Sequence, residues 1–362
     1  MLAAGGTGGH LFPAFALAEE LGRRRIAVEL VTDMRGDRYG TGFPARAVHR
    51  IHSATLAGRS PIAMARTGVK LARGVRQAYV LMDKSRPDAV VGFGGYPSFP
   101  PLAAARMHKI PAILHEQNAV LGRANRMLAK RVDLIATSFR KVGLVGDAVA
   151  GKVRFTGNPV RQAVIDSAGT AFDEPFASGP FRLLVFGGSQ GARYFSDAVP
   201  PALAMLPRDI RARLVVVQQA RDEDIARTQA AYAAAGIAAE VAAFFRDLPQ
   251  RMAASHLVIA RAGASSVAEL AVIGRPSILV PLPHALDNDQ LRNATTLAES
   301  GGAWCIEQKD FSPERLAAEI GCLATTRGVL AGAAVAAKAQ GRPDAVARLA
   351  DLVEELARGS IM

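Results

Sequence analysis

Short runs of β-branched and other apolar residues alternate with Ala- and Leu-rich stretches of helical spacing along most of the chain. This alternation predicts βαβ units, in which crossover helices join parallel strands. Residues 166–180 interrupt the pattern with glycines and prolines, which predicts a linker. We expect strands near residues 27–31, 89–93, 112–115 and 133–137 before the linker, and near 182–186, 213–217, 257–260 and 277–280 after it.

A small pattern of strand, glycine turn and helix recurs along the chain. It occurs twice before the linker and once after it, in LAAGGTGGHLFPAFALAEEL, VVGFGGYPSFPPLAAARM and LLVFGGSQGARYFSDAVPPAL. The repetition predicts an α/β protein of two Rossmann-like halves that bind ligands where the glycine turns lie, at the carboxyl ends of the strands. A closing helix packed on a domain is predicted from the helical spacing of Val346, Leu349, Leu352, Val353 and Leu356.

Composition supports a globular chain of two domains. The 362 residues are 50% hydrophobic and 21% charged. The two cysteines, Cys305 and Cys322, belong to no CxxC or Cys/His cluster, which argues for a reducing compartment and against a disulfide framework or structural zinc. The sequence shows no basic leader and no apolar run of about 18–20 residues, so we expect a soluble or peripheral protein.

The charge is concentrated in the first half of the chain. Residues 1–160 carry 24 Lys and Arg against 10 Asp and Glu, whereas residues 161–362 carry 20 against 22. We therefore expect the first half to face an anionic partner, either phospholipid or nucleic acid, with an Arg-rich surface that has no particular partner as the alternative. Nucleic acid is disfavoured, because aromatic residues make up only 6% and no stacking platform or RNP-like motif is present.

Residues 62–82 combine basic and apolar faces at helical spacing. Arg66, Lys70 and Arg73 share one face, and Leu71, Val75, Ala78, Tyr79 and Met82 share another. A basic amphipathic helix of this kind can lie on an anionic membrane surface. The alternative is an ordinary core-facing helix, and two internal glycines weaken the helix prediction itself.

The opening loop, GGTGGH, is the first candidate site. Its glycines allow a ligand close to the backbone, and Pro13 suits the first turn of the following helix. The loop lacks both the GxGxxG fingerprint and the P-loop lysine. His10 is placed where strand gives way to helix and can serve as a base near neutral pH, although local packing is the alternative.

A second candidate site follows the strand at 257–260, in RAGASSVAE. A helix beginning near Ser265 after Gly263 would offer backbone amides to a diphosphate, and Glu269 could accept both hydroxyls of a ribose. The alternative is a capping box formed by Ser266 and Glu269, which needs no ligand.

Three further polar stretches are candidates for the same ends of the sheets. HEQN, residues 115–118, follows a strand and lines a cleft or forms a polar loop. GNPVR places Arg161 near a phosphate or simply on the surface. DNDQLRNA is rich in carboxylates, but it forms no regular oxygen-ligand loop, so we expect no metal site.

Seven motifs in order resemble those of the MurG family of lipid glycosyltransferases: GGTGGHLFPA, GFGGYPS, HEQN, GNPVR, FGGSQGAR, RAGASSVAE and DNDQLRNA. They cover the chain from residue 3 to about residue 294. The resemblance implies a GT-B fold, with two Rossmann-like domains whose parallel sheets face each other across a cleft and a last helix that crosses back to the first domain. Residues 1–160, with about 341–362, would form the acceptor and membrane domain, and residues 161–340 the UDP-GlcNAc domain.

The resemblance also implies a reaction. N-acetylglucosamine would pass with inversion from UDP-GlcNAc to the C4 hydroxyl of MurNAc in undecaprenyl-diphospho-MurNAc-pentapeptide, on the cytoplasmic face of the plasma membrane. No cofactor or bound metal would be required, and other cell-wall or division proteins are possible partners. The alternatives are another UDP-sugar-dependent lipid glycosyltransferase, a UDP-sugar epimerase, or a catalytically silent nucleotide- or membrane-binding module.

The matching motifs also imply which residues of this chain would form the site. His10 is the first candidate for the catalytic base and Glu116 the second. The acceptor or membrane side would include Arg66, Lys70, Arg73, Tyr96 and His115. The donor side would comprise Thr7, Gly8, Gly9, Asn118, Arg161, Ser189, Phe245, Arg261, Ala264, Ser265, Ser266, Val267, Glu269 and Gln290.

Three departures from the family pattern stand out. The first strand, residues 1–4, is short, so we expect it to be frayed unless the start or the numbering has been trimmed. Ala262 stands where relatives often carry Ser, and Asp289 stands where some carry Gln.

Overall fold

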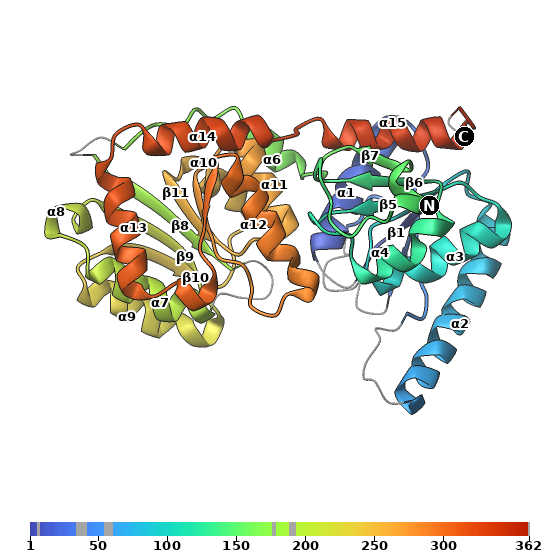
Figure 1. Cartoon of the computed structure of the whole chain (residues 1–362), viewed down its shortest axis with the longest axis horizontal. Coiled ribbons are helices and arrows are strands. Elements are labelled where there is room, and N and C mark those ends of the chain that lie inside the picture. Colours follow the sequence, from blue (N-terminus) through green and yellow to red (C-terminus); the bar gives the residue numbers. More distant parts are fainter. Residues whose placement is uncertain (6–7, 34–41, 54–60, 176–178, 188–192, 361–362) are drawn as a thin grey trace. The chain divides into compact units, whose positions relative to one another are not determined.

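The computed structural model describes residues 1–5, 8–33, 42–53, 61–175, 179–187 and 193–360. The chain divides into two compact units (Figure 1). Unit 1 consists of Met1–Arg161 together with Pro343–Met362, and unit 2 consists of Gln162–Arg342.

Unit 1 is built on a seven-stranded parallel sheet of order β3-β2-β1-β4-β5-β6-β7. The strands are β1 (Leu2–Ala3), β2 (Glu29–Thr32), β3 (Ala47–Arg50), β4 (Val90–Gly92), β5 (Ala112–Glu116), β6 (Leu134–Thr137) and β7 (Val153–Phe155). The strand order reverses between β1 and β4. In open α/β sheets this reversal is where ligands bind, at the carboxyl ends of the strands.

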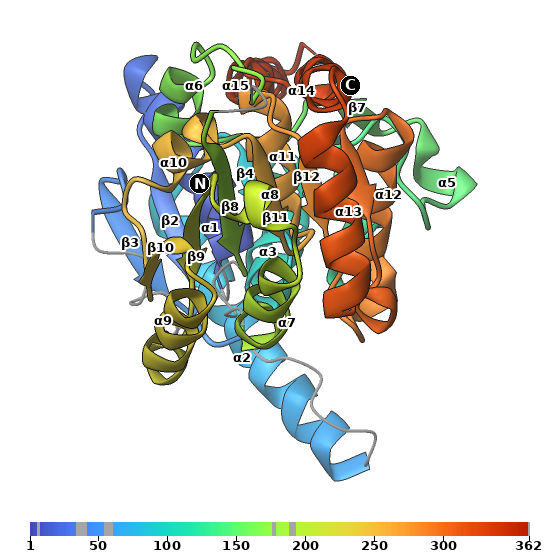
Figure 2. The ribbon, with the colours of Figure 1, turned by 90° about the vertical axis from the view of Figure 1, so that its left-hand side faces the viewer.

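Helices cover both faces of this sheet. On one face, α1 (Gly8–Arg23) and α15 (Ala345–Ala357) share an apolar core with alternate strand residues. The other face packs on α2 (Pro61–Ser85), α3 (Phe99–His108) and α4 (Arg123–Leu128). Short helical segments complete the unit: η2 (Tyr96–Ser98), η3 (Ala129–Arg131) and α5 (Asp147–Ala150). The first turns of α2 extend beyond α3 (Figure 2).

Unit 2 contains a six-stranded parallel sheet of order β10-β9-β8-β11-β12-β13, which reverses between β8 and β11. Its strands are β8 (Phe181–Phe186), β9 (Leu214–Gln219), β10 (Ala238–Ala242), β11 (Leu257–Ala260), β12 (Ser277–Leu279) and β13 (Ala303–Cys305).

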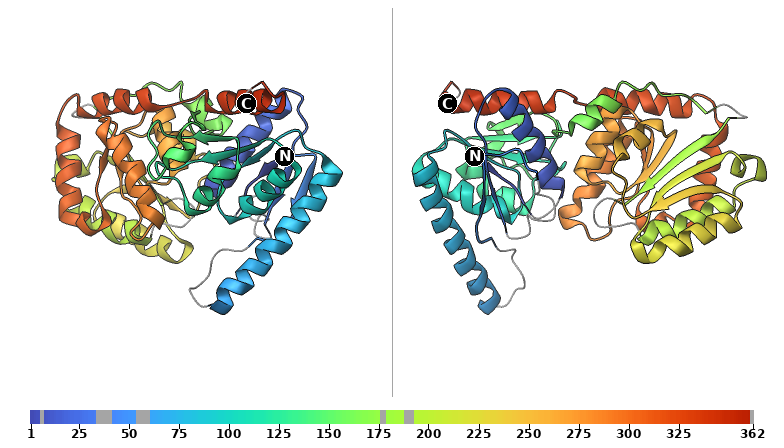
Figure 3. Two further views of the ribbon diagram at one scale, coloured as in Figure 1. Left: turned by 45° about the vertical axis from the view of Figure 1, so that its right-hand side comes forward. Right: turned by 180° about the vertical axis from the view of Figure 1, so that it is seen from behind.

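The helices of unit 2 also form two layers, which Figure 3 shows on either side of the strands. One layer consists of α7 (Arg193–Ala204), α9 (Ile225–Ala234) and α13 (Pro313–Thr325), with the short α8 (Arg208–Arg211). The other consists of α6 (Gln162–Ser167), α10 (Leu248–Ala254), α11 (Ala264–Ile273), α12 (Asp289–Glu299) and α14 (Val329–Gln340). Single 3-10 turns are η5 (Asp222–Asp224), η6 (Leu286–Asn288) and η7 (Gln308–Asp310).

Both parallel sheets and the eight predicted strands are confirmed, as β2, β4, β5, β6, β8, β9, β11 and β12. Two local predictions are wrong. The first strand is not frayed: β1 is two residues long but lies between β2 and β4, and the amino group of Met1 donates to the Ala89 carbonyl at 2.8 Å. Pro13 is not in the first turn of its helix, because α1 already begins at Gly8.

The closing helix returns to unit 1 as predicted. Its expected apolar stripe is buried, and α15 packs along α1. Arg24, directly after α1, forms ion pairs with Asp351 at 2.6 Å and Glu354 at 2.8 Å on α15. The C-terminal segment therefore contributes its core to the unit that begins the chain.

A buried arginine fixes the predicted linker within unit 2. Arg275, which is 1% exposed, follows α11 and donates to the carbonyls of Thr170 and Ala171 at 3.0 and 3.2 Å. Its Nε donates to the Ala253 carbonyl at the end of α10, at 2.9 Å. This guanidinium thus joins the segment after α6 to the end of α10, where it satisfies a helix-end carbonyl.

Candidate functional site

At the carboxyl ends of the unit 1 strands, the glycine turn after β4 meets the start of α1. Gly94 and Gly95, after β4, have φ angles of 82° and 67°. Ser98 ties this turn to β1, because its hydroxyl donates to the carbonyls of Ala3 and Gly94 at 2.9 and 2.8 Å. A Cβ at position 95 would lie 3.2 Å from Cε1 of His10. The absence of a side chain at Gly95 therefore lets the turn after β4 approach the start of α1 closely.

His10 lies in the first turn of α1, at the reversal of the strand order. Its ring is partly buried and hydrogen-bonds the Gly5 carbonyl. Burial lowers the pKa of His10, although the Gly5 hydrogen bond opposes this shift. A neutral ring that donates one N–H to a carbonyl keeps the lone pair on its other nitrogen, which is the form a general base needs.

A second histidine lies behind His10. His115, on β5, is fully buried; its Nδ1 accepts from Gln117 Nε2 at 2.9 Å, and its Nε2 donates to the Gly157 carbonyl at 3.4 Å. Burial lowers the pKa of His115 to about 4, and the charge on His10 acts in the same direction. His115, which we grouped with the acceptor or membrane residues, is therefore an interior residue held in one tautomer.

Glu116 is buried, and both of its carboxylate oxygens accept hydrogen bonds from the chain itself. Oε1 accepts from the backbone and side-chain nitrogens of Asn118 at 3.0 and 3.3 Å. Oε2 accepts from the Gly122 amide at 2.8 Å and from Asn125 Nδ2 at 2.7 Å. Burial raises the pKa of Glu116, and the four donors oppose that rise. The carboxylate thus positions Asn118 and the start of α4.

The GNPVR segment lies against the same cluster. Gly157, with a φ of 89°, offers its carbonyl to His115, and the Arg161 guanidinium lies 4.9 Å from the ring centroid of Phe12 on α1. Between them, Asn158 is buried. Sequence reasoning selected Arg161 from this motif and overlooked Asn158, just as it overlooked Asn125. The only available signal was the presence of polar amides after two strands.

In unit 2, the start of α11 lies at the corresponding reversal of the strand order. The N-cap is Gly263, the helix begins at Ala264, and the N-cap forms no side-chain hydrogen bond. The capping-box alternative for Ser266 and Glu269 is therefore wrong, since both residues lie inside the helix. The amides of the first turn are left to be satisfied from outside the helix, and the Ser265 hydroxyl is buried without a hydrogen-bond partner.

Arg261 precedes this helix and is buried against aromatic rings. Its guanidinium lies 5.0 Å from the Phe195 centroid and donates to the Pro281 carbonyl at 3.2 Å and to Gln308 Oε1 at 2.6 Å. Burial lowers the pKa of Arg261. In the second turn of α11, Glu269 is 6% exposed.

The loop after β12 has an unusual backbone. His284, Asp287 and Asn288 have φ angles of 64°, 56° and 54°, which non-glycine residues adopt at a cost in free energy. Gln290 closes the loop by accepting from the Leu282 amide at 3.0 Å. Asp289 Oδ1 accepts from the Gln290 amide at 2.7 Å.

Phe245 is buried under Arg251, whose guanidinium lies 4.4 Å from its ring, while the neighbouring Phe244 is 71% exposed. Thr7 and Ser189 lie outside the described residues. In the described part of the chain, no three His, Cys, Asp or Glu side chains come together as a metal site.

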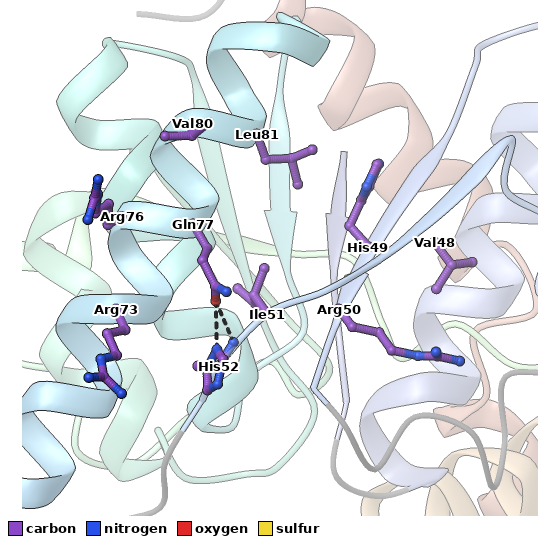
Figure 4. Close-up of a pocket in the computed structure, with 10 residues that line it drawn as sticks. All are labelled: Val48, His49, Arg50, Ile51, His52, Arg73, Arg76, Gln77, Val80 and Leu81. Atoms are coloured by element: carbon purple, nitrogen blue, oxygen red, sulfur yellow. Dashed lines mark hydrogen bonds between the residues drawn. The ribbon is translucent and has the colours of Figure 1, made fainter.

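A separate basic groove lies between β3 and α2 (Figure 4). It has a volume of about 660 Å³, and its lining residues are Val48, His49, Arg50, Ile51, His52, Arg73, Arg76, Gln77, Val80 and Leu81. A Cβ at Gly74 would overlap the His52 carbonyl, at 2.0 Å, so this glycine lets α2 cross the end of β3.

The rest of α2 is exposed where it extends past α3. Arg66, Lys70 and Arg73 are exposed, as are Met64 and Val69 at 56% and 55%. Ala78 and Met82, near the other end, are buried in the core. Among the described residues, no single helix is long and apolar enough to cross a bilayer, although the bent pair Pro313–Thr325 and Val329–Ala357 passes the same length and composition criteria together.

Comparisons with known proteins agree with this architecture. Residues 1–137 match the glycosyltransferase family 28 N-terminal domain, and residues 182–349 match the family 28 C-terminal domain. A protein of Mesorhizobium japonicum is 56% identical over 99% of this chain and 95% of its own length, and one of Rhodopseudomonas palustris is 54% identical over 99% and 98%. Both are named UDP-N-acetylglucosamine–N-acetylmuramyl-(pentapeptide) pyrophosphoryl-undecaprenol N-acetylglucosamine transferase.

Solved structures show the same likeness. The crystal structure of Acinetobacter baumannii MurG superposes with a TM-score of 0.81 at 29% identity, covering 98% of both chains. A putative UDP-N-acetylglucosamine 2-epimerase from Listeria monocytogenes superposes with a TM-score of 0.69 at 14% identity, which is a likeness of fold alone.

Proposed function

Since the chain belongs to the MurG family of glycosyltransferases, with the GT-B fold, we propose a division of its reaction between the two units. The reaction is the transfer of N-acetylglucosamine from its UDP donor to undecaprenyl-pyrophosphoryl-N-acetylmuramyl-pentapeptide. In the proposal, unit 1 holds the acceptor and the base, and unit 2 holds UDP-GlcNAc. The epimerase alternative rests on fold likeness alone, whereas the transferase relatives share more than half of their residues with this chain.

His10 is the proposed general base, and the contact of its ring with the Gly5 carbonyl and the Gly95 turn carries this proposal. The C4 hydroxyl of the acceptor attacks the anomeric carbon of GlcNAc as the bond to UDP breaks, and His10 accepts the hydroxyl proton. The product has inverted configuration. Glu116 is less suited to this role, because four N–H groups of the chain occupy its oxygens.

In the proposal, unit 2 and Arg161 stabilise the negative charge that develops on UDP. The amides of Ala264, Ser265 and Ser266, which the N-cap side chain does not cap and which lie at the positive end of the α11 dipole, are suited to a diphosphate. Preorganised donors of this kind stabilise a leaving group without a metal ion. Glu269 would accept the ribose hydroxyls, and Gln290 and Asn118 would contact the GlcNAc.

The exposed end of α2 and the basic groove are proposed to rest on anionic phospholipid at the cytoplasmic face of the plasma membrane, with Tyr96 toward the acceptor. Exposed Met64 and Val69 beside Arg66 and Lys70 support this proposal, because apolar and cationic side chains together favour an anionic interface. The resemblance to the family further suggests that the protein binds other cell-wall or division proteins, and we include this binding in the proposal.

The transfer is tested by measuring UDP release with UDP-GlcNAc and a lipid-linked acceptor analogue. We expect strong preference for UDP-GlcNAc over UDP-glucose and UDP-galactose; equal rates with the three donors would contradict the proposed donor site.

Membrane binding is tested by sedimentation with vesicles that contain anionic phospholipid. The triple change Arg66→Glu, Lys70→Glu and Arg73→Glu should reduce binding at least tenfold, since each cation near the surface contributes about 1 kcal/mol. Arg208→Glu, on exposed α8, is the matched control. Undiminished binding of the triple variant would exclude α2 as the contact.

A further inference from the structure

Two buried asparagines in unit 1 have hydrogen-bonding capacity that the chain does not use. Asn158 is 5% exposed, and neither its Oδ1 nor its Nδ2 has a partner. Asn125 is 3% exposed; its Nδ2 donates to Glu116, but its Oδ1 has no partner. More than nine in ten buried polar groups are paired in proteins, and each unpaired one costs about 1–3 kcal/mol. These three atoms therefore point to a ligand that supplies the missing partners.

Both asparagines adjoin the histidine cluster, and they reach it from different loops. Asn125 packs on the turn of Gly94 and Gly95, because a Cβ at Gly94 would lie 3.3 Å from its Oδ1, and Gly95 of the same turn packs on the His10 ring. Asn158 directly follows Gly157, whose carbonyl accepts from His115. A group bound to both amides would thus lie beside the proposed base.

The backbone holds Asn158 in place before any ligand arrives. The amides of Thr156 and Gly157 both donate to the Thr137 carbonyl at 3.1 Å, and Pro159 restricts the residue that precedes it. Glu116 orients the Asn125 amide in the same way. Such fixed polar groups favour a ligand of matching shape, because little freedom is lost when it binds.

The chemistry of an unpaired carboxamide identifies its complement. Asn158 presents one acceptor and one N–H₂ donor side by side, and a secondary amide presents the matching C=O and N–H. We propose that Asn158 binds the acetamido group of the acceptor N-acetylmuramyl sugar and that Asn125 Oδ1 accepts a hydrogen bond from the same sugar. This inference rests on the proposed placement of the acceptor on unit 1.

The experiment combines an enzyme variant with a substrate variant. Asn158→Ala should raise KM for the lipid-linked acceptor about 10- to 100-fold, with KM for UDP-GlcNAc changed less than twofold. With an acceptor analogue that has a hydroxyl in place of the acetamido group, kcat/KM of the wild-type enzyme should fall by a similar factor. In Asn158→Ala, the same analogue should lower kcat/KM little further, because this variant has already lost the interaction with the acetamido group. Asn125→Ala should raise the same acceptor KM.

Met82→Val, a conservative change in the buried core of unit 1 on α2, controls for general loss of stability and should leave both KM values unchanged. Equal losses with the analogue in wild-type enzyme and in Asn158→Ala would overturn the acetamido assignment. A rise in donor KM alone would overturn the placement of Asn158 on the acceptor side. A lower melting temperature with unchanged kinetics would make the residue purely structural. Full turnover in His10→Gln, with the Asn158 results as expected, would instead remove the proposed base and leave this inference standing.

Discussion

The two units carry the same sheet architecture, yet they equip the reversal of strand order in different ways. In unit 1 this position is occupied by side chains that can titrate or orient one another: the partly buried His10 and the buried His115 and Glu116. In unit 2 it is occupied by the start of α11, where the N-cap Gly263 provides no side-chain hydrogen bond to the first-turn amides. A parallel sheet thus fixes where a ligand binds, and the residues at the turn decide what is done to it.

This difference suits the two halves of a displacement reaction. Proton transfer needs a group whose pKa lies near the working pH, which only a side chain supplies. A departing diphosphate needs fixed positive dipoles that do not reorganise, which a helix end supplies. If the comparison is right, changes to His10 and the groups around it in unit 1 should affect kcat or the acceptor, whereas changes around α11 in unit 2 should affect the donor or the stability of the unit.

Loss of the His10 base should have the largest effect. His10→Gln keeps a hydrogen bond to Gly5 within reach but removes the basic nitrogen, so kcat should fall about 10²- to 10⁴-fold. Binding of UDP-GlcNAc, measured by calorimetry, should remain unchanged because unit 2 is intact. In the wild-type enzyme the acid limb of kcat/KM should lie below pH 6.5, since burial lowers the pKa of His10. If His10→Gln kept the wild-type kcat, the assignment of the base to unit 1 would be wrong.

Removal of the buried cation of unit 2 should chiefly affect stability. Arg275→Met removes the buried guanidinium that donates to the carbonyls of Thr170, Ala171 and Ala253, so we expect a loss of about 3 kcal/mol in the free energy of unfolding. Chemical denaturation measures this loss, and exposed Arg208→Met is the control. Retention of wild-type stability would show that Arg275 is not what fixes the linker.

Acid should destabilise both units through one buried histidine in each. Burial lowers the pKa of His115 and of His256 to about 4, and in His256 the charge of Arg182 adds to the effect. Between pH 6.5 and pH 4 the unfolded chain therefore binds more protons, so stability is complete above pH 6.5 and is lost as pH falls toward 4. The loss reaches about 3 kcal/mol for each histidine.

His256→Gln separates the two contributions. The Arg182 amide donates to Nδ1 of His256 at 3.0 Å, a bond that protonation of Nδ1 breaks and that the Gln oxygen can accept. The variant should lose roughly half of the acid sensitivity in denaturation curves recorded between pH 7 and pH 4. Unchanged acid sensitivity would mean that His256 takes up its proton as readily in the folded chain as in the unfolded chain.

The sequence predicted the central strands and overlooked those at the edges for a physical reason. β3, β7, β10 and β13 are the four edge strands, and β3, with alternating exposed residues, lacks the continuous apolar run of a strand buried on both faces. Charged and short edge strands are also what discourages unwanted pairing. β2 and β11, by contrast, are buried throughout and were predicted directly.

The candidate site divides in the same way. Glycine turns and helix starts are local features, so the sequence alone located His10 and the start of α11. The hydrogen bonds of Glu116 to Gly122 and Asn125, and the approach of Gly157 to His115, join loops that the sequence does not pair. Tertiary packing decides such contacts, and it changes Glu116 from a candidate base into a residue that positions others.

The smallest effect is expected from Glu269, and it tests whether unit 2 acts on the donor alone. Glu269→Gln keeps the shape of the side chain and one acceptor oxygen while removing the charge, so KM for UDP-GlcNAc should rise about 10-fold with kcat within a factor of three. The acceptor KM should stay constant, which steady-state kinetics with both substrates varied will show. Because Glu269 is buried in α11, a melting curve must accompany the kinetics. A fall in kcat with unchanged donor KM would place Glu269 in the chemical step and remove the division of labour between the two units.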